Sequence, residues 1–156
     1  MQRISYQKAA PEALQSMLAF SAATRKTDLP EKLLSLVDFR VSQMNGCAFC
    51  LDMHSKDLRA LGETEQRIYM VSAWREVAHL YTARERAALA WAEAITALAG
   101  QQVPDAVYEQ ARAEFSDKEL AELTLAIVAI NGWNRLNVAF HTPAGNYKSR
   151  FQKAAA

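Results

Sequence analysis

The sequence predicts an all-α protein, a bundle of six to eight helices joined by short connections. Three observations favour this class. Apolar residues recur with a helical period through most of the 156 residues. Almost all of the four prolines and five glycines fall between the segments that show this period. No stretch of four or more residues combines strand-like alternation with β-branched residues, so no sheet is expected.

Capping residues, prolines and glycines divide the chain into seven expected helices. In chain order, they run from Pro11 to about Arg25, from Pro30 to Asn45, from Cys47 to Leu61, from Thr64 through Trp74, from Ala87 to Ala99, from Pro104 onward, and from Ser116 to Thr142. Capping boxes at Thr82 and Ser116 open the fifth and seventh helices. The seventh is hydrophobic nearly all round between Leu123 and Ile130, which is typical of a central helix or of one buried in a subunit contact.

Length and charge limit the possible functions. A chain of 156 residues is expected to form one domain, residues 1–156. Its 18 basic and 17 acidic residues are interspersed, so neither nucleic acid nor an anionic membrane is an expected partner. The first eight residues contain no apolar signal segment, and asparagines with Arg135 interrupt the apolar stretch from Leu123 to Phe140. A cytoplasmic location is therefore expected, where a Cys-x-x-Cys pair is more often catalytic than structural.

Residues 45–54 contain both cysteines of the chain and one of its three histidines. In a helix that starts near Cys47, Cys50 lies roughly 60° and His54 roughly 20° from Cys47 around the axis, so all three share one face. The preceding Asn45-Gly46 turn places both thiols in the first turn, where the helix dipole favours an anion and lowers a thiol pKa. An imidazole one turn away can accept or return the thiol proton. The pattern predicts a dithiol redox site.

Three other interpretations of the two cysteines are open. They can be buried thiols that pack as small apolar groups. They can form a structural disulfide, although a bridge across so short a loop constrains the unfolded chain little. They can bind zinc together with His54, but that gives three ligands, and a fourth would have to come from His79 or His141. The sequence has no glycine-rich dinucleotide motif and no phosphate loop, so no cofactor is expected.

The run Phe39–His54, followed by Gly62-Glu63-Thr64-Glu65-Gln66-Arg67, closely resembles the core of the AhpD-like carboxymuconolactone decarboxylase superfamily. The later segments 85–93 and 134–136 are similar to downstream segments of the same group, so the resemblance defines a core of about residues 30–140. It implies an AhpD-like helical bundle that assembles as a homo-oligomer, often a trimer or hexamer, with the site near subunit contacts.

The resemblance also implies alkylhydroperoxidase-like activity. In the family's scheme, Cys50 attacks the peroxide and becomes a sulfenic acid, Cys47 resolves it to a disulfide, and His54 relays protons. An external dithiol, on a lipoyl protein or a thioredoxin-like protein, then recycles the site. The expected substrate is a hydroperoxide. This agrees with the independent expectation for an exposed thiolate beside a resolving thiol.

The sequence departs from the family pattern at two positions. A glutamate is expected twelve residues before the first cysteine, where this chain has Ser35, and some members carry a histidine where this chain has Phe49. Glu93 is the first candidate for a substitute acid, followed by Glu85 and Asp38. His79 and His141 are interpreted as loop or helix-end residues without a catalytic role.

The main hypothesis is therefore a cysteine-based peroxidase that uses Cys47, Cys50, His54 and Glu93. A thiol–disulfide adaptor or sensor with little peroxidase activity is an alternative. A lactone decarboxylase, suggested by the superfamily's name, is another, since that chemistry needs no pair of cysteines. A purely structural oligomerisation module is the last.

Overall fold

A computed structural model describes residues 1–100 and 102–151 of the chain. Over these residues it consists of eight α-helices and two short 3-10 helices, with no strand. The elements are α1 (Tyr6–Ala9), α2 (Pro11–Ala23), α3 (Glu31–Met44), α4 (Ala48–Ala60), α5 (Glu65–Met70), η1 (Val71–Ala73), η2 (Ala78–Leu80), α6 (Ala83–Thr96), α7 (Asp105–Glu114) and α8 (Asp117–Phe140). The predicted all-α class and the predicted range of six to eight helices are confirmed.

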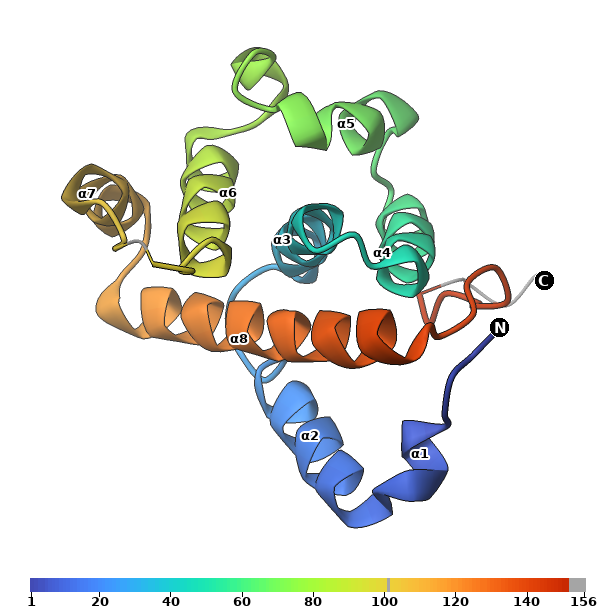
Figure 1. Cartoon of the computed structure of the whole chain (residues 1–156). Coiled ribbons are helices and arrows are strands. Elements are labelled where there is room, and N and C mark those ends of the chain that lie inside the picture. The colour runs from blue at the N-terminus through green and yellow to red at the C-terminus, as the bar shows by residue number, and fades with distance from the viewer. Residues whose placement is uncertain (101, 152–156) are drawn as a thin grey trace.

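Helix α3 is the centre of the molecule. Figure 1 shows it between α4 and α6, with α5 on one side and the long α8 crossing on the other. Nine of its fourteen residues, all between Leu33 and Ser42, are buried. One apolar cluster joins α3 to α6, α7 and α8, and a second joins it to α4, α5 and η1. Because α3 is enclosed by other helices, polar side chains on it are buried beside their partners.

Most predicted boundaries agree with the structure to within a few residues. Both capping boxes form: Thr82 with Glu85 opens α6, and Ser116 with Glu119 opens α8. The helix expected from Thr64 through Trp74 instead ends at Met70 and continues as the 3-10 turn η1. The short α1 was not expected, because four residues are too few to show a helical period. Helix α6 ends at Thr96, three residues before the predicted end.

The hydrophobic part of α8 is buried on one side only. Leu123, Ile127 and Ile130 are buried in the core, whereas Leu125 and Val128 are 48% and 49% exposed. One side of the helix is therefore part of the core, and the other leaves apolar side chains on the surface of the single chain. The subunit contact that the sequence also allowed stays a prediction. It ends at His141, which has the left-handed φ of 52° at the C-cap, just before the predicted stop.

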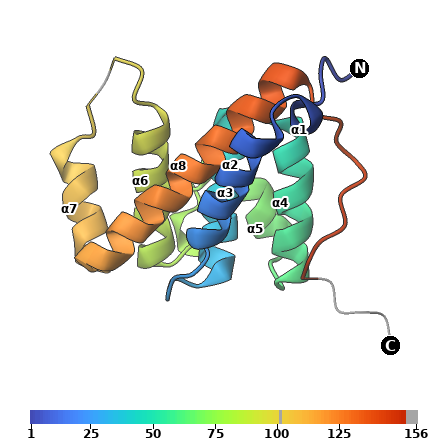
Figure 2. The ribbon, with the colours of Figure 1, turned by 90° about the horizontal axis from the view of Figure 1, so that it is seen from below.

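The two ends of the described chain pack on α8 and α4. Helices α1 and α2 lie against α8, as Figures 1 and 2 show from two directions, and α2 has no fully buried residue. The segment after α8 runs beside α4, where Lys56 donates to the carbonyl oxygens of Gly145 and Tyr147 at 3.0 and 3.1 Å. None of the helices in the described part of the chain is both long and apolar enough to cross a membrane.

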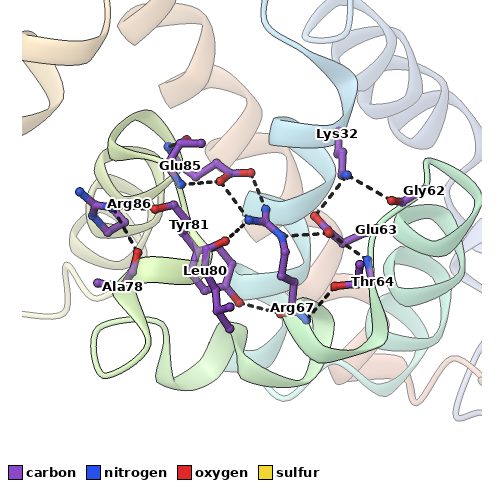
Figure 3. Close-up of polar contacts among 11 residues, drawn as sticks. Lys32, Gly62, Glu63, Thr64, Arg67, Ala78, Leu80, Tyr81, Glu85 and Arg86 are labelled. Carbon is purple, nitrogen blue, oxygen red and sulfur yellow. Dashed lines mark hydrogen bonds and ion pairs between the residues drawn. The ribbon is translucent and has the colours of Figure 1, made fainter.

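A network of ion pairs connects α3, α5 and α6 (Figure 3). The guanidinium of Arg67 lies between two carboxylates, 2.9 Å from Glu63 and 2.5 Å from Glu85. Glu63 is 8% exposed and also lies 3.6 Å from the ammonium of Lys32. The Tyr81 hydroxyl donates to the backbone oxygen of Arg67 at 2.6 Å. These contacts fasten the broken helical segment 65–73 to the rest of the bundle.

Candidate functional site

The two cysteines lie where the chain turns from α3 into α4. Gly46 makes the turn with a φ of 64°, in the left-handed region that favours glycine. Cys47 is the N-cap of α4 and Cys50 is in its first turn. Their sulfurs form a disulfide, with the two Cα atoms 5.3 Å apart, and the backbone N–H of Cys50 donates to the sulfur of Cys47 at 3.3 Å. Both cysteines lie at the amino end of this helix, with Cys47 one residue before the helix rather than inside it.

Both sulfurs are inside the protein. Cys47 is 1% exposed and Cys50 is not exposed at all. The sulfur of Cys50 accepts a hydrogen bond from the side-chain amide of Asn137 in α8, at 3.5 Å. The Tyr6 hydroxyl in α1 donates to the other end of the same amide at 3.0 Å. The sulfur of Cys50 therefore lies in an enclosed space that side chains of α1, α4 and α8 form together.

His54 lies one turn after Cys50 on α4 and is 5% exposed. Its Nδ1 is 3.8 Å from the carboxylate of Asp38, whereas its Nε2 is buried without a hydrogen-bond partner. Burial lowers the pKa of His54, and the nearby Asp38 opposes that shift only in part. The imidazole is therefore neutral at pH 7, with a free nitrogen that can accept a proton.

Asp38 is the acid that the structure places beside His54. It lies on α3, is 1% exposed, and forms a close ion pair with Arg25. Ser35, where the family pattern expects a glutamate, is one helical turn before Asp38 and is also buried. On α3, this chain therefore has a buried carboxylate at Asp38, one helical turn after Ser35, the position where the family pattern expects a glutamate.

Glu93, the first candidate from the sequence, has different partners. Its carboxylate accepts from Arg40 at 2.6 Å and from the indole N–H of Trp74 at 3.0 Å, and it pairs with Arg75. No hydrogen bond or ion pair joins it to His54 among the described residues. Glu85 is in the capping box of α6 and pairs with Arg67, as its capping pattern suggested. Of the three candidate acids, the geometry therefore favours Asp38.

A cavity of about 540 Å³ lies next to these groups. Its polar lining includes His54, Asp38, Arg25 and Asn137, and most of the remaining lining is apolar. The apolar side chains come from α2, α4 and α8 and are Leu18, Ala22, Phe49, Met53, Ala126, Ala129, Ile130 and Trp133. The two cysteines do not line this cavity themselves. A molecule inside it would meet His54 and Asn137, and the sulfur of Cys50 lies behind Asn137.

Two residues at this site were not assigned by sequence reasoning. Tyr6 gave no signal, because it lies in a four-residue helix 131 positions before its partner. Asn137 belongs to a group of asparagines near the end of α8 for which the sequence leaves two interpretations open, a polar lining near the site or partners for carbonyl groups in an interface. The other two histidines lie elsewhere on the surface, His79 in η2 and His141 at the end of α8. In the described ranges, no three His, Cys, Asp or Glu side chains gather as a metal site would require.

Known proteins resemble this chain in sequence. The family model described as the carboxymuconolactone decarboxylase family matches residues 11–94. The uncharacterized protein YdfG of Bacillus subtilis is 41% identical over 145 residues, which are 93% of this chain and 98% of that protein. The uncharacterized protein YnjA of Escherichia coli is 32% identical over 131 residues, 84% of this chain and 71% of that protein.

Solved structures share the fold. A protein of unknown function from Agrobacterium tumefaciens, ATU0492, has a TM-score of 0.89 and 42% identity, over 94% of this chain and all of that one. The role suggested for it is that of an antioxidant defence protein, AhpD. A peroxidase-related protein from Silicibacter has a TM-score of 0.76 and 25% identity, over 90% of this chain and 75% of that one.

Proposed function

This chain belongs to the AhpD-like carboxymuconolactone decarboxylase family, and on that basis we propose that it is a cysteine-based peroxidase that reduces organic hydroperoxides. One observation carries the proposal. A pair of cysteines close enough to form a disulfide starts a helix that also carries a buried, neutral histidine one turn later. Such a pair can take up two oxidising equivalents and hold them as a disulfide.

The reaction starts from the reduced pair. His54 takes the proton of the Cys50 thiol, and the thiolate attacks one oxygen of the hydroperoxide. The sulfur–oxygen bond forms as the oxygen–oxygen bond breaks, so Cys50 becomes a sulfenic acid and the alkoxide leaves with the proton that His54 returns. The Cys47 thiol then gives up its proton as its sulfur attacks the Cys50 sulfur. The sulfur–oxygen bond breaks, and the hydroxide takes that proton and leaves as water. An external dithiol reduces the resulting disulfide through a mixed disulfide.

The electrostatics of His54 suit this role. A neutral imidazole at pH 7 can accept the thiol proton, and a protonated one would lie 3.8 Å from the carboxylate of Asp38. Asp38 can thus orient Nδ1 and stabilise the imidazolium while the proton is held. In this proposal Asp38, rather than Glu93, takes the place of the family's glutamate.

The cavity supports an organic rather than a small inorganic peroxide. Its apolar walls favour an alkyl or aryl group, and its volume of about 540 Å³ is within the range of small-molecule sites. The charged lining residues are two arginines, Arg25 and Arg150, and two aspartates, Asp38 and Asp57, so the walls carry no net charge that would attract a charged substrate. The hydroperoxide end would point toward His54 and Asn137, past which it reaches Cys50.

The decisive experiment follows the oxidation of the reduced protein by one equivalent of cumene hydroperoxide or hydrogen peroxide. We expect fast formation of the Cys47–Cys50 disulfide with the organic peroxide and slower formation with hydrogen peroxide. Cys50→Ser should lower the rate of peroxide consumption at least a hundredfold. In Cys47→Ser, the sulfenic acid of Cys50 should accumulate and react with dimedone, which mass spectrometry can locate.

Other outcomes favour other functions. A Cys50→Ser protein that reduces peroxide at the wild-type rate would contradict the proposal. Slow oxidation by every peroxide, together with fast exchange with a lipoyl or thioredoxin-like dithiol, would favour a thiol–disulfide adaptor. Lactone turnover that survives the loss of both cysteines would favour a decarboxylase. The cytoplasmic location and the trimeric or hexameric assembly stay predictions.

A further inference from the structure

The sulfur of Cys50 has a hydrogen-bond donor that no part of the proposed mechanism uses. The side-chain amide of Asn137 is 4% exposed and makes three contacts. Its Nδ2 donates to the sulfur of Cys50 at 3.5 Å and to the backbone oxygen of Trp133 at 2.9 Å, and its Oδ1 accepts from the Tyr6 hydroxyl at 3.0 Å. All of its polar atoms are thus engaged, and one partner is the sulfur that reacts.

These partners allow one orientation of the amide. The carbonyl oxygen of Trp133 can only accept, so the NH₂ group must face it and, with it, the sulfur. In this orientation the amide oxygen faces Tyr6 and accepts from its hydroxyl. Burial raises the pKa of Tyr6, which keeps the proton on its hydroxyl. A reversed amide would place its oxygen against the carbonyl oxygen of Trp133, so it would lose the Trp133 contact and the N–H that faces the sulfur.

Tyr6 is itself fixed in place. Its ring packs on Phe140, with 5.9 Å between the ring centroids. The backbone N–H of Arg3 donates to the backbone oxygen of Phe140 at 3.0 Å, and the Arg3 side chain donates to the oxygen of Ala139 at 3.1 Å. The segment that carries Tyr6 is therefore attached to the end of the helix that carries Asn137.

We propose that Asn137 is a further functional residue, which donates to the reduced Cys50 sulfur and so stabilises its ionised form, and that Tyr6 is the residue that positions it. A hydrogen bond to a charged acceptor is stronger than one to a neutral acceptor, so the donor favours the thiolate over the thiol. Both residues lie outside the stretch 11–94 that the family model matches. The role of Asn137 in peroxide reduction rests on the proposed function, whereas its effect on the ionisation of the Cys50 thiol does not.

The test measures the ionisation of Cys50 directly. In a Cys47→Ser background, the rate of alkylation by iodoacetamide against pH gives the pKa of the Cys50 thiol. Asn137→Ala should raise this pKa by about one unit, a tenfold loss of thiolate at a pH well below it. Tyr6→Phe should raise it by about half a unit, because the amide remains but is no longer held.

Two control variants separate this role from a structural one. Asn134→Ala removes another buried amide of α8, which contacts Ser42 and Asn45 but no sulfur. Tyr108→Phe removes the hydroxyl of a tyrosine that is 44% exposed. Neither should change the pKa of Cys50, even if Asn134→Ala lowers the melting temperature. Where Asn137→Ala does not give a folded protein, Tyr6→Phe decides.

Failure of the proposal can be told apart from failure of the proposed function. If Asn137→Ala and Tyr6→Phe both leave the pKa of Cys50 within about 0.2 units of the parent, the proposal is overturned, whatever the peroxidase activity. If the pKa rises as expected but the wild-type protein reduces no hydroperoxide, the proposal stands and the peroxidase function falls. If both hold, Asn137→Ala should lose about tenfold in peroxidase rate at pH 7 and regain it at a pH above the raised pKa.

Discussion

At the scale of single residues, the site depends on a few buried polar side chains whose partners come from distant parts of the sequence. The Nδ1 of His54 lies near the carboxylate of Asp38, whereas its Nε2 has no hydrogen-bond partner. Asp38 forms an ion pair with Arg25, which balances the charge of the buried carboxylate. Because burial of an unpaired ion is costly, these pairings decide which groups are charged in the folded state.

The buried His54 predicts a pH dependence of stability. Its pKa in the folded protein is below the value of about 6.5 in the unfolded chain, so the unfolded chain binds a proton first as the pH falls. The free energy of unfolding should therefore be highest above pH 6.5 and decrease below it, by up to about 1.4 kcal/mol per pH unit. Urea unfolding at pH values from 7.5 to 5 measures this slope.

The matched variants for this prediction are His54→Asn and His79→Asn. The slope between pH 7.5 and 5 should largely disappear in His54→Asn and remain in His79→Asn, since His79 is exposed in η2. An unchanged slope in His54→Asn would mean that another group is responsible.

The same residues show what the sequence can and cannot predict about the site. Cys47, Cys50 and His54 could be recognised because their spacing places them together on one local segment, and α4 does so. Asp38 could not be preferred over Glu93 from spacing alone, because both are helix-borne acids and only the packing of α3 against α4 brings one of them to His54. Asn137 and Tyr6 depend on contacts across 87 and 131 positions, which a local pattern does not contain.

At the scale of the elements, the segment from α5 to η2 is the least regular part of the core. Its helical turns are short, and the chain is attached to α3 and α6 through the network around Arg67 (Figure 3). The sequence predicted one helix from Thr64 through Trp74. Its apolar residues Ile68, Val71 and Trp74 are all buried, as expected. After Met70, however, the α-helix changes into the 3-10 helix η1. Hydrophobic spacing predicted which residues face inward but not where the α-helix ends.

Arg67→Ala tests the energetic weight of this network. The substitution leaves the buried carboxylate of Glu63 without its closest partner, so we expect the free energy of unfolding to decrease by about 3 kcal/mol. Arg59→Ala is a suitable control, because its pair with Glu65 is exposed on both sides and should contribute less than about 1 kcal/mol. Urea or thermal unfolding measures both. If the free energy of unfolding decreased equally in the two variants, the Arg67 network would contribute no more than an exposed ion pair, which would contradict this interpretation.

At the scale of the whole molecule, the helices differ greatly in how deeply they are packed. Nine residues of α3 are buried, whereas α2 has none and contacts mainly α1 and α8. The contact is close where the side chain of Met17 reaches Gly132, since a Cβ atom at that glycine would lie 2.6 Å from Met17. The core is thus continuous around α3, and α1 and α2 form an outer layer on α8 (Figure 2).

Hydrogen exchange can test this difference in packing. Backbone amides of α2 should exchange at least a hundredfold faster than those of α3 in the isolated chain, because local opening of α2 exposes little buried apolar surface. Mass spectrometry of peptides from the two helices gives the comparison within one sample. Protection of α2 as strong as that of α3 would contradict the expectation and would point to another copy of the chain covering this layer.

The position of the cavity has an evolutionary consequence. Its walls include Leu18 and Ala22 before the central helices and Tyr147 after them, whereas the sulfurs and His54 belong to the central helices themselves. Substitutions at Leu18, Ala22 and Tyr147 can change which molecules enter without altering the helix that carries Cys50 and His54. Divergence among homologues in the compounds they accept should therefore be concentrated at these wall positions.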